Sequence, residues 1–174
     1  RISFGTKHQH AQNTISNGGS SVGLKIESNV NLAPYTTLRA GGAASQFVFA
    51  RSTDELAEAA IFADRSGLPL FVLGAGSNVL PADEGITGLV VVNGAKNFQF
   101  DPVTGEATVD SGPALQDLFL KCAQNGLGGM EHAVGIPGSV GGALVSNAGA
   151  YRSNLSKHLL ELEIAFEEKR QWVS

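Results

Sequence analysis

Apolar and polar positions alternate with helical spacing between residues 52 and 67. Ser52, followed three residues later by Glu55, matches a capping box at the start of this segment, and Gly67 is placed to end it. The sequence therefore predicts a helix here, with one apolar face: Leu56, Ala59, Ala60 and Ala63.

A second helical pattern begins near Pro113, a residue suited to a first helical turn, and ends at Gly126. Its apolar face is Leu115, Leu118, Phe119 and Cys122. Cys122 is the only cysteine, which excludes an internal disulfide and any CxxC metal site and indicates a reducing compartment. Its place on a core-facing stripe predicts a buried structural thiol rather than a nucleophile.

Short apolar runs between these segments are typical of strands: LPLFVLG (68–74), GLVVVN (88–93) and EATVDSG (106–112). The segment LLELEIAFEEKRQWV (159–173) predicts a strand, a turn around Glu168 and Lys169, and a second strand. Because strands and helices are mixed along the chain, the pattern predicts an α+β or α/β class.

Residues 1–23 show neither helical nor strand periodicity. They include Arg1 and Lys7 but no acidic residue, and they are rich in Ser, Asn, Gln and Gly. Such a composition rarely supports a packed core, so we predict that this segment is disordered and that the folded domain comprises residues 24–174. An alternative interpretation is the tail of an organelle transit peptide, which is basic, Ser-rich and poor in acids.

The composition limits the class of protein. The chain has 174 residues, 43% of them hydrophobic and 16% charged, which fits one soluble globular domain or two small subdomains. Its net charge of -4 argues against a nucleic-acid surface. No apolar run approaches the roughly 20 residues that a membrane span requires.

Two glycine-rich segments carry the candidate chemistry. The first, LGAGSNVL (73–80), follows a predicted strand, but Val79 replaces the third glycine of a dinucleotide fingerprint and no lysine follows as in a Walker loop. What remains is a turn that exposes the amides of Gly76, Ser77 and Asn78, a concave nest able to hold an anion such as a pyrophosphate. A plain β-turn is the alternative.

The second segment, GMEHAVGIPGSVGGALVSNAGAY (129–151), has no charged residue after Glu131. Glycine is used where a chain turns with positive φ or is approached closely, so this density indicates bare amides around a ligand. Two such loops suit a long ligand that bears phosphates and a flat ring, because amides can hold phosphate without Lys or Arg. Glycine-rich tight packing is the alternative.

These two segments and APYTTLRAGGAAS (33–45) occur in the order and approximate spacing of the UDP-N-acetylenolpyruvoylglucosamine reductases, which the chain resembles over about residues 31–151. The resemblance implies an α+β FAD-binding domain of the vanillyl-alcohol-oxidase (PCMH) type, with FAD between two α+β subdomains. It also implies these cofactor-binding residues: Thr37, Arg39, Gly74, Ala75, Gly76, Ser77, Asn78, Val79, Gly135, Ile136, Pro137, Gly138, Ser139, Gly141, Gly142, Asn147, Gly149, Ala150 and Tyr151.

The chain departs from the family pattern at Arg152, where the family usually carries glycine, and at Met130, where leucine is common. The family's tyrosine–arginine motif, its proton-donating serine and its late glutamate are expected after Ser174. The resemblance therefore assigns no catalytic residue and no metal ligand to these 174 residues, and it implies a domain truncated before the substrate-binding half.

Two functional hypotheses follow from the resemblance. The first is the FAD-binding part of a reductase in peptidoglycan precursor synthesis, in which NADPH reduces FAD and FAD reduces a UDP-sugar, UDP-N-acetylglucosamine enolpyruvate. The second is a non-catalytic descendant that binds flavin or other proteins, for example in a plastid complex. The first implies a bacterial cytoplasm, and the second implies the plastid stroma after removal of a transit peptide.

Overall fold

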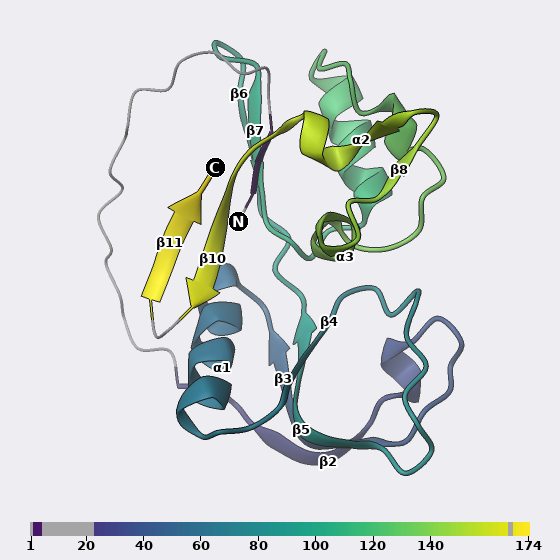
Figure 1. Ribbon diagram of the computed structural model, residues 1–174, viewed down its shortest axis with the longest axis vertical. Helices are drawn as coiled ribbons and strands as arrows, with labels where there is room; N and C mark the ends of the chain where they lie inside the picture. The colour runs from purple at the N-terminus through teal and green to yellow at the C-terminus, as the bar shows by residue number, and fades with distance from the viewer. Residues whose placement is uncertain (1, 5–22, 167–168) are drawn as a thin grey trace.

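The computed structural model describes residues 2–4, 23–166 and 169–174. It contains two larger sheets with helices packed against them and one two-stranded sheet, which gives the predicted α+β class with two subdomains (Figure 1). No helix in the described ranges is both long enough and apolar enough to cross a membrane.

The first subdomain is a mixed four-stranded sheet in the order β2-β3-β5-β4, with α1 (Thr53–Arg65) on one face. Strands β3 and β4 run parallel to β5, and β2 runs antiparallel to β3. The strands are β2 (Glu27–Asn31), β3 (Ala43–Ala50), β4 (Leu70–Leu73) and β5 (Ile86–Asn93).

The apolar run GLVVVN lies in β5. The run lacks alternating polar residues because β5 is buried on both faces. Leu89 and Val91 pack with Ala59 and other residues of α1, while Val90 and the residues on its side pack against Phe47 and Leu32. A strand covered on both sides is continuously apolar rather than alternating.

The second subdomain is an antiparallel five-stranded sheet in the order β11-β10-β1-β7-β6. Its strands are β1 (Ile2–Phe4), β6 (Phe98–Asp101), β7 (Glu106–Val109), β10 (Leu159–Phe166) and β11 (Lys169–Val173). Helices α2 (Leu115–Gln124) and α3 (Val140–Val145) share a core with β7 that includes Val109, Leu118 and Val140. The shorter elements are η1 (Ala33–Tyr35), η2 (Glu131–Ala133), η3 (Leu155–Lys157), β8 (Gly149–Ala150) and β9 (Ser153–Asn154).

The first predicted helix is confirmed as α1. The Ser52 hydroxyl accepts a hydrogen bond from the Glu55 N–H at 3.1 Å, and Gly67 follows the helix with φ of 61°. The Glu55 carboxylate accepts from the Arg51 N–H at 2.7 Å instead of from Ser52, so the capping box is displaced by one residue.

The second predicted helix is confirmed as α2, which begins two residues after Pro113 without a side-chain cap and is followed by Gly126 with φ of 76°. Cys122 is 2% exposed, and burial raises the pKa of its thiol to about 11. The thiol is therefore protonated at neutral pH, in agreement with a structural role. The two strands predicted within residues 159–173 are confirmed as the antiparallel β10 and β11, and the turn predicted around Glu168 lies partly outside the described ranges.

The prediction that residues 1–23 stay outside the fold is wrong at the start of the chain. Residues Ile2–Phe4 form β1, which pairs with β10 on one side and with β7 on the other. A three-residue strand carries too little pattern to be recognised in a sequence, and its partners lie more than 100 residues away. Residues 5–22 lie outside the described ranges.

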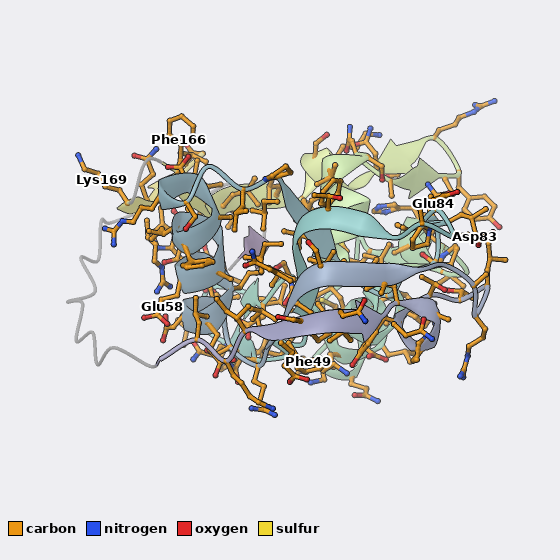
Figure 2. The ribbon with its side chains drawn as sticks, turned by 90° about the horizontal axis from the view of Figure 1, so that it is seen from below. Phe49, Glu58, Asp83, Glu84, Phe166 and Lys169 are labelled. Atoms are coloured by element: carbon orange, nitrogen blue, oxygen red, sulfur yellow. The ribbon has the colours of Figure 1, made fainter. Side chains whose placement is uncertain are left out.

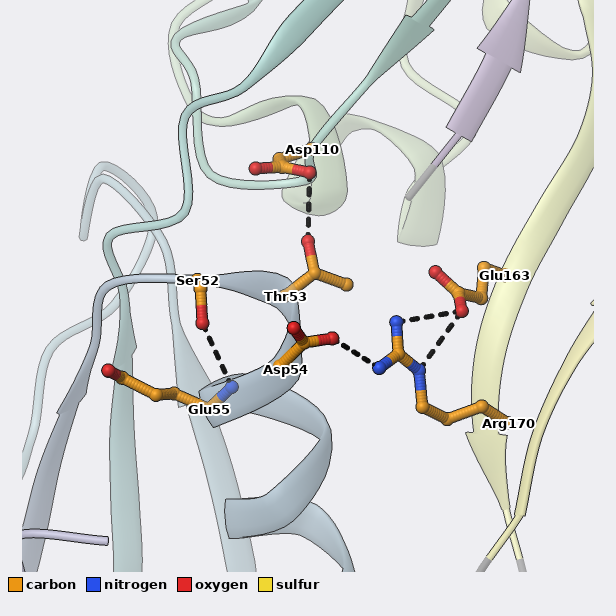
Figure 3. A network of polar contacts seen from close by, with 7 residues as sticks. All are labelled: Ser52, Thr53, Asp54, Glu55, Asp110, Glu163 and Arg170. Atoms are coloured by element: carbon orange, nitrogen blue, oxygen red, sulfur yellow. Dashed lines mark hydrogen bonds and ion pairs between the residues drawn. The ribbon is translucent and has the colours of Figure 1, made fainter. Parts of the chain in front are cut away.

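The two subdomains are joined by polar contacts at the N-terminus of α1 (Figure 3). Arg170 of β11 forms an ion pair with Asp54 in the first turn of α1 and, at 2.8 Å, with Glu163 of β10. Thr53 donates a hydrogen bond of 2.8 Å to Asp110, at the end of β7. These contacts fix α1 against the five-stranded sheet.

Replacing Arg170 with alanine is expected to lower the free energy of unfolding by about 1–3 kcal/mol, because Glu163 would lose a charged partner in a partly buried place. The Arg170 and Glu163 side chains are 27% and 12% exposed. Urea unfolding would measure the change. The control is Lys25→Ala, which removes a pair with Glu27 from a side chain that is 82% exposed and should change stability by less than about 0.5 kcal/mol. Equal effects of the two variants would contradict the expectation.

Candidate functional site

The first glycine-rich loop, residues 74–79, lies against the segment that carries the expected Thr37 and Arg39. The Gly76 carbonyl accepts hydrogen bonds from both the N–H and the hydroxyl of Thr37, at 3.0 and 3.2 Å. A Cβ at Gly76 would lie 2.2 Å from the Tyr35 carbonyl oxygen, and Gly76 has φ of 63°. The loop thus requires glycine at this position for two reasons, close approach and a left-handed backbone.

The same loop also meets the second glycine-rich loop, residues 135–142. A Cβ at Gly74 would lie 2.2 Å from the Ser139 hydroxyl oxygen. A Cβ at Gly138, which has φ of 119°, would lie 3.3 Å from the Ser77 hydroxyl oxygen. The structure therefore brings three segments that are far apart in the sequence to one place, residues 35–39, 74–79 and 135–139.

This junction presents backbone N–H groups that are not used inside the protein. Within the described part of the chain, the N–H groups of Gly76, Ser77 and Asn78 donate no hydrogen bond to protein, and neither do those of Gly138 and Ser139. Thr37, Arg39, Ser77 and Asn78 are exposed beside them. Amides gathered on a concave loop form an anion site, so the junction suits a phosphate or pyrophosphate.

The expectation of a loop of bare amides over residues 129–151 does not hold for residues 140–145. Residues Val140–Val145 form α3, in which the Ser139 hydroxyl caps the helix by accepting from the Gly142 N–H at 3.2 Å. The Gly141 N–H donates to the Ser111 carbonyl at 2.8 Å, and a Cβ at Gly141 would lie 3.0 Å from the Ser111 Cβ. Tertiary packing here overrides the low helix propensity of glycine, and these two amides are occupied.

Residues 111–115, which sequence reasoning did not include in the site, hold the second loop in place. The Leu115 N–H donates to the Gly138 carbonyl at 2.9 Å, and the Val140 N–H donates to the Pro113 carbonyl at 2.8 Å. The turn-forming residues of the sequence DSGP (110–113) indicate a turn here. Only the fold shows that this turn supports the second glycine-rich loop.

The expected cofactor-binding residues between Asn147 and Tyr151 lie partly in a short hairpin, outside the segments that form the junction of the two glycine-rich loops. Gly149–Ala150 and Ser153–Asn154 pair as β8 and β9, with Tyr151 and Arg152 as a two-residue turn with φ of 52° and 63°. Positive φ at both central residues defines a type I′ turn, which favours Asn and Gly and explains a preference for glycine at position 152. Tyr151 is 86% exposed, and β8 contacts η2.

Two histidines stack beside this hairpin. The rings of His132 and His158 lie 5.8 Å apart, and the buried His132 has its Nδ1 3.2 Å from the Gly129 carbonyl oxygen. Partial burial lowers the pKa of His158, and a positive charge on His132 opposes its protonation further. The Glu131 carboxylate accepts from the Gly129 N–H at 2.8 Å, which lowers the pKa of Glu131.

Protonation of His158 is expected to destabilise the fold. Between its lowered pKa and the ordinary value of about 6.5, the unfolded chain binds more protons, so stability rises with pH through this window and is lost as the pH falls below about 6.5. Urea unfolding at pH 7.5 and 5.5 would show the loss, and His158→Gln should reduce it. The same pH dependence in both proteins would contradict this assignment.

The arrangement indicates what the site can do. In the described ranges no group of three or more His, Cys, Asp or Glu side chains could hold a metal ion. The converging loops offer amides, the exposed hydroxyl of Ser77 and the exposed guanidinium of Arg39, while the hydroxyls of Thr37 and Ser139 are used within the protein. Such groups are suited to hold the phosphates of a nucleotide by backbone donors.

The comparisons with known proteins agree with a site of this kind. The family model described as FAD binding domain matches residues 44–169, so the chain belongs to the FAD binding domain family. The resemblance to the UDP-N-acetylenolpyruvoylglucosamine reductases is confirmed by the curated relatives. The reductase of Nostoc punctiforme is 41% identical over 140 residues, and that of Acaryochloris marina is 44% identical over 128 residues.

The structural comparison agrees as well. The crystal structure of UDP-N-acetylenolpyruvylglucosamine reductase from Thermus caldophilus matches with a TM-score of 0.67 at 30% identity, covering 86% of this chain and 52% of that one. The sequence matches cover 80% of this chain for the Nostoc protein and 73% for the Acaryochloris protein, but 42% of each relative. The chain thus spans less than half the length of these two relatives.

Proposed function

We propose that the chain binds FAD with the pyrophosphate at the junction of the two glycine-rich loops, as part of an NADPH-dependent reductase of UDP-N-acetylglucosamine enolpyruvate. The observation that carries the proposal is the convergence of free amides from residues 76–78 and 138–139 at a place where added Cβ atoms would collide. Amides gathered in this way can hold the phosphates of a long anionic cofactor, and the family match supports FAD as that cofactor.

Each loop has a separate role in this proposal. Gly76, Ser77 and Asn78 would donate to one phosphate, and Gly138 and Ser139 to the other. Thr37 acts indirectly, since its two hydrogen bonds to the Gly76 carbonyl fix the orientation of the first loop. Arg39 supplies the exposed positive charge beside these amides. Gly141 and Gly142 contribute the turn into α3 rather than donors, because their N–H groups are bonded within the protein.

Flavin supplies the hydride chemistry when bound, while the protein supplies position and protons. The residues named here bind and orient; none of them is assigned a proton transfer. Tyr151 and Arg152 are held in the β8–β9 turn, and His132 is buried with its Nδ1 directed to a backbone carbonyl. The proton donor and the groups that hold the substrate are therefore proposed to lie in the part of the relatives' length that this chain does not span.

Absorbance of the purified chain tests the cofactor directly. After incubation with FAD and gel filtration, we expect the visible absorbance of flavin to appear in the fractions that contain the protein. A colourless protein with all flavin in the low-molecular-weight fractions would overturn the proposal.

A turnover assay tests the division of roles, and we expect a chain of residues 1–174 to be inactive by itself. Without a placed acid, the reaction loses a rate enhancement of about 10²–10⁴-fold from general acid catalysis. Without an oriented substrate it loses a larger rate enhancement from positioning. The FAD-loaded chain would receive NADPH and UDP-N-acetylglucosamine enolpyruvate while NADPH oxidation is followed. Turnover of about 1–10³ s⁻¹ would place the catalytic groups within this chain. Slow flavin reduction without product would favour the alternative, a non-catalytic flavin-binding subunit.

A further inference from the structure

The three parallel strands of the four-stranded sheet end at the same edge of that sheet. Ala50, at the end of β3, lies opposite Asn93, at the end of β5. Leu73, at the end of β4, lies opposite Val92, the residue before Asn93. The first glycine-rich loop, residues 74–79, follows Leu73 directly. Asn93 therefore lies next to the strand end from which this loop begins.

Asn93 carries a buried side-chain amide that contacts the other subdomain, and the residue is 8% exposed. Its Nδ2 donates to the Ser111 hydroxyl at 2.7 Å, and its Oδ1 accepts from the Ala95 N–H at 3.2 Å. A Cβ at Gly112 would lie 2.9 Å from the Asn93 carbonyl oxygen and 3.0 Å from the Asn93 Oδ1. Because a buried amide is costly unless it is hydrogen-bonded, Asn93 holds Ser111 and Gly112 closely against the end of β5.

Ser111 joins Asn93 to the second glycine-rich loop, residues 135–142. Its hydroxyl accepts from the Asn93 amide, and its carbonyl accepts from the Gly141 N–H at 2.8 Å. A Cβ at Gly141 would lie 3.0 Å from the Ser111 Cβ, so these two residues are closely packed. One side chain at the end of β5 is thus connected through a single residue to the second loop, while the neighbouring strand β4 continues into the first loop.

A different contact holds the start of the same turn (Figure 3). The buried Asp110 accepts from the Thr53 hydroxyl and from the Asn97 N–H, both at 2.8 Å. These bonds connect the turn to α1 and to the segment before β6, and neither involves the second loop. Loss of the Asn93 bond therefore leaves the turn attached while it releases the Ser111 hydroxyl.

We propose that Asn93 is a positioning residue, whose bond to Ser111 sets the distance between the amides of residues 76–78 and 138–139 to fit two linked phosphates. This inference rests on the proposed function, in which each loop holds one phosphate of FAD. Groups that bind one ligand together must be held within about 0.5 Å by the residues behind them. A flavin with a single phosphate, FMN, needs only one loop. The Asn93–Ser111 bond therefore makes the site selective for FAD over FMN.

Dissociation constants for FAD and FMN test this selectivity in the full 174-residue chain. Asn93→Leu removes both bonds of the amide at a similar side-chain size, and Ser111→Ala removes only the hydroxyl. We expect each variant to weaken FAD binding by at least about tenfold and FMN binding by less than about threefold, because a misplaced loop affects only a ligand that spans both loops. The double variant should bind FAD no more weakly than Asn93→Leu alone, since both changes break the same bond. Unchanged FAD binding, or equal weakening for FAD and FMN, would overturn the inference.

Ser45 supplies a matched control at the other end of the parallel strands. Its hydroxyl donates to the Gly88 carbonyl at 3.0 Å and accepts from the Gly88 N–H at 2.9 Å, so Ser45→Ala also removes hydrogen bonds of a serine hydroxyl. Ser45 is near the start of β3, whose last residue is paired with Asn93. Figure 2 shows Asp83, shortly before β5 begins, away from Phe49, near the end of β3. Ser45→Ala should lower the melting temperature but leave the binding of both flavins unchanged. A comparable loss of FAD binding in this variant would show that the effect comes from general destabilisation.

Amide hydrogen exchange of the free chain, followed by NMR, tests the positioning without a ligand. The Gly141 N–H is protected by the Ser111 carbonyl, so Asn93→Leu should speed its exchange by at least about fivefold while the amides of α1 keep their rates. An unchanged rate at Gly141 would overturn the inference, whatever the effect on flavin binding. Failure of the intact chain to bind FAD would count against the proposed function alone. Where FMN or both flavins fail to bind the intact chain, the rate at Gly141 decides whether Asn93 positions the second loop.

Discussion

A chain without residues 1–4 is expected to melt at a temperature roughly 5–15 °C lower than the intact chain, because the five-stranded sheet would lose its central strand. Strand β1 connects the β10–β11 hairpin to the β7–β6 hairpin. Each ladder hydrogen bond is worth about 0.5–1.5 kcal/mol net, and several are lost on two edges at once, so we expect a loss of about 2–5 kcal/mol. For a chain of this size, 1 kcal/mol corresponds to about 2–4 °C.

A substitution separates this effect from other consequences of deletion. Ser3 lies opposite Glu161 and Thr108, in the middle of β1. Ser3→Pro removes an N–H from a central strand and should destabilise the chain in the same direction, whereas Ser3→Ala keeps the backbone donor and should have little effect. Melting curves would measure all three proteins. A deletion variant and a Ser3→Pro variant that both melt with the intact chain would show that the β1 pairing contributes no stability.

Replacing Gly138 or Gly76 with valine is expected to weaken FAD binding at least about 100-fold. A side chain at Gly138 would enter the space in which the two loops meet, and one at Gly76 would collide with the backbone of residues 35–36 that supports the first loop. Either change would also force a branched residue to positive φ, at a cost of about 1–3 kcal/mol per site. At Gly76 the new Cβ would also lie 2.2 Å from the Tyr35 carbonyl oxygen. At Gly138 the nearest atom is the Ser77 hydroxyl oxygen at 3.3 Å, so this variant disturbs the fold less.

Gly67 supplies the matched control. It has φ of 61°, close to the 63° of Gly76, but nothing lies within 4 Å of an added Cβ, and it follows α1 away from the site. Gly67→Val should therefore lower the melting temperature through backbone strain but leave flavin binding unchanged. Flavin retention after gel filtration and the melting temperature would be measured for each variant. A yellow, flavin-bearing Gly76→Val/Gly138→Val double variant would refute the placement of the cofactor.

The sequence by itself determined the elements whose causes are local. The capping residue Ser52, the apolar stripe of α1 and the terminating Gly67 all lie within 16 residues, and the helix forms where they predict it. The run GLVVVN likewise predicted a strand, which is β5. The glycine density of residues 73–80 and 129–151 also singled out two loops that the structure brings into contact at Gly74 and Ser139.

The tertiary structure decided everything that depends on contacts between distant residues. Strand β1 is too short to show a period, and it exists because two strands more than 100 residues away offer their edges. Gly141 and Gly142 lie in a helix that Ser111 supports by packing against Gly141 and that Ser139 caps at the Gly142 N–H, which no local propensity predicts. The meeting of Gly74 with Ser139, and of Arg170 with Asp54, is set by the arrangement of the two sheets. A local pattern specifies an element through its own backbone and its apolar face, but the partner of that face is chosen only when the whole chain packs.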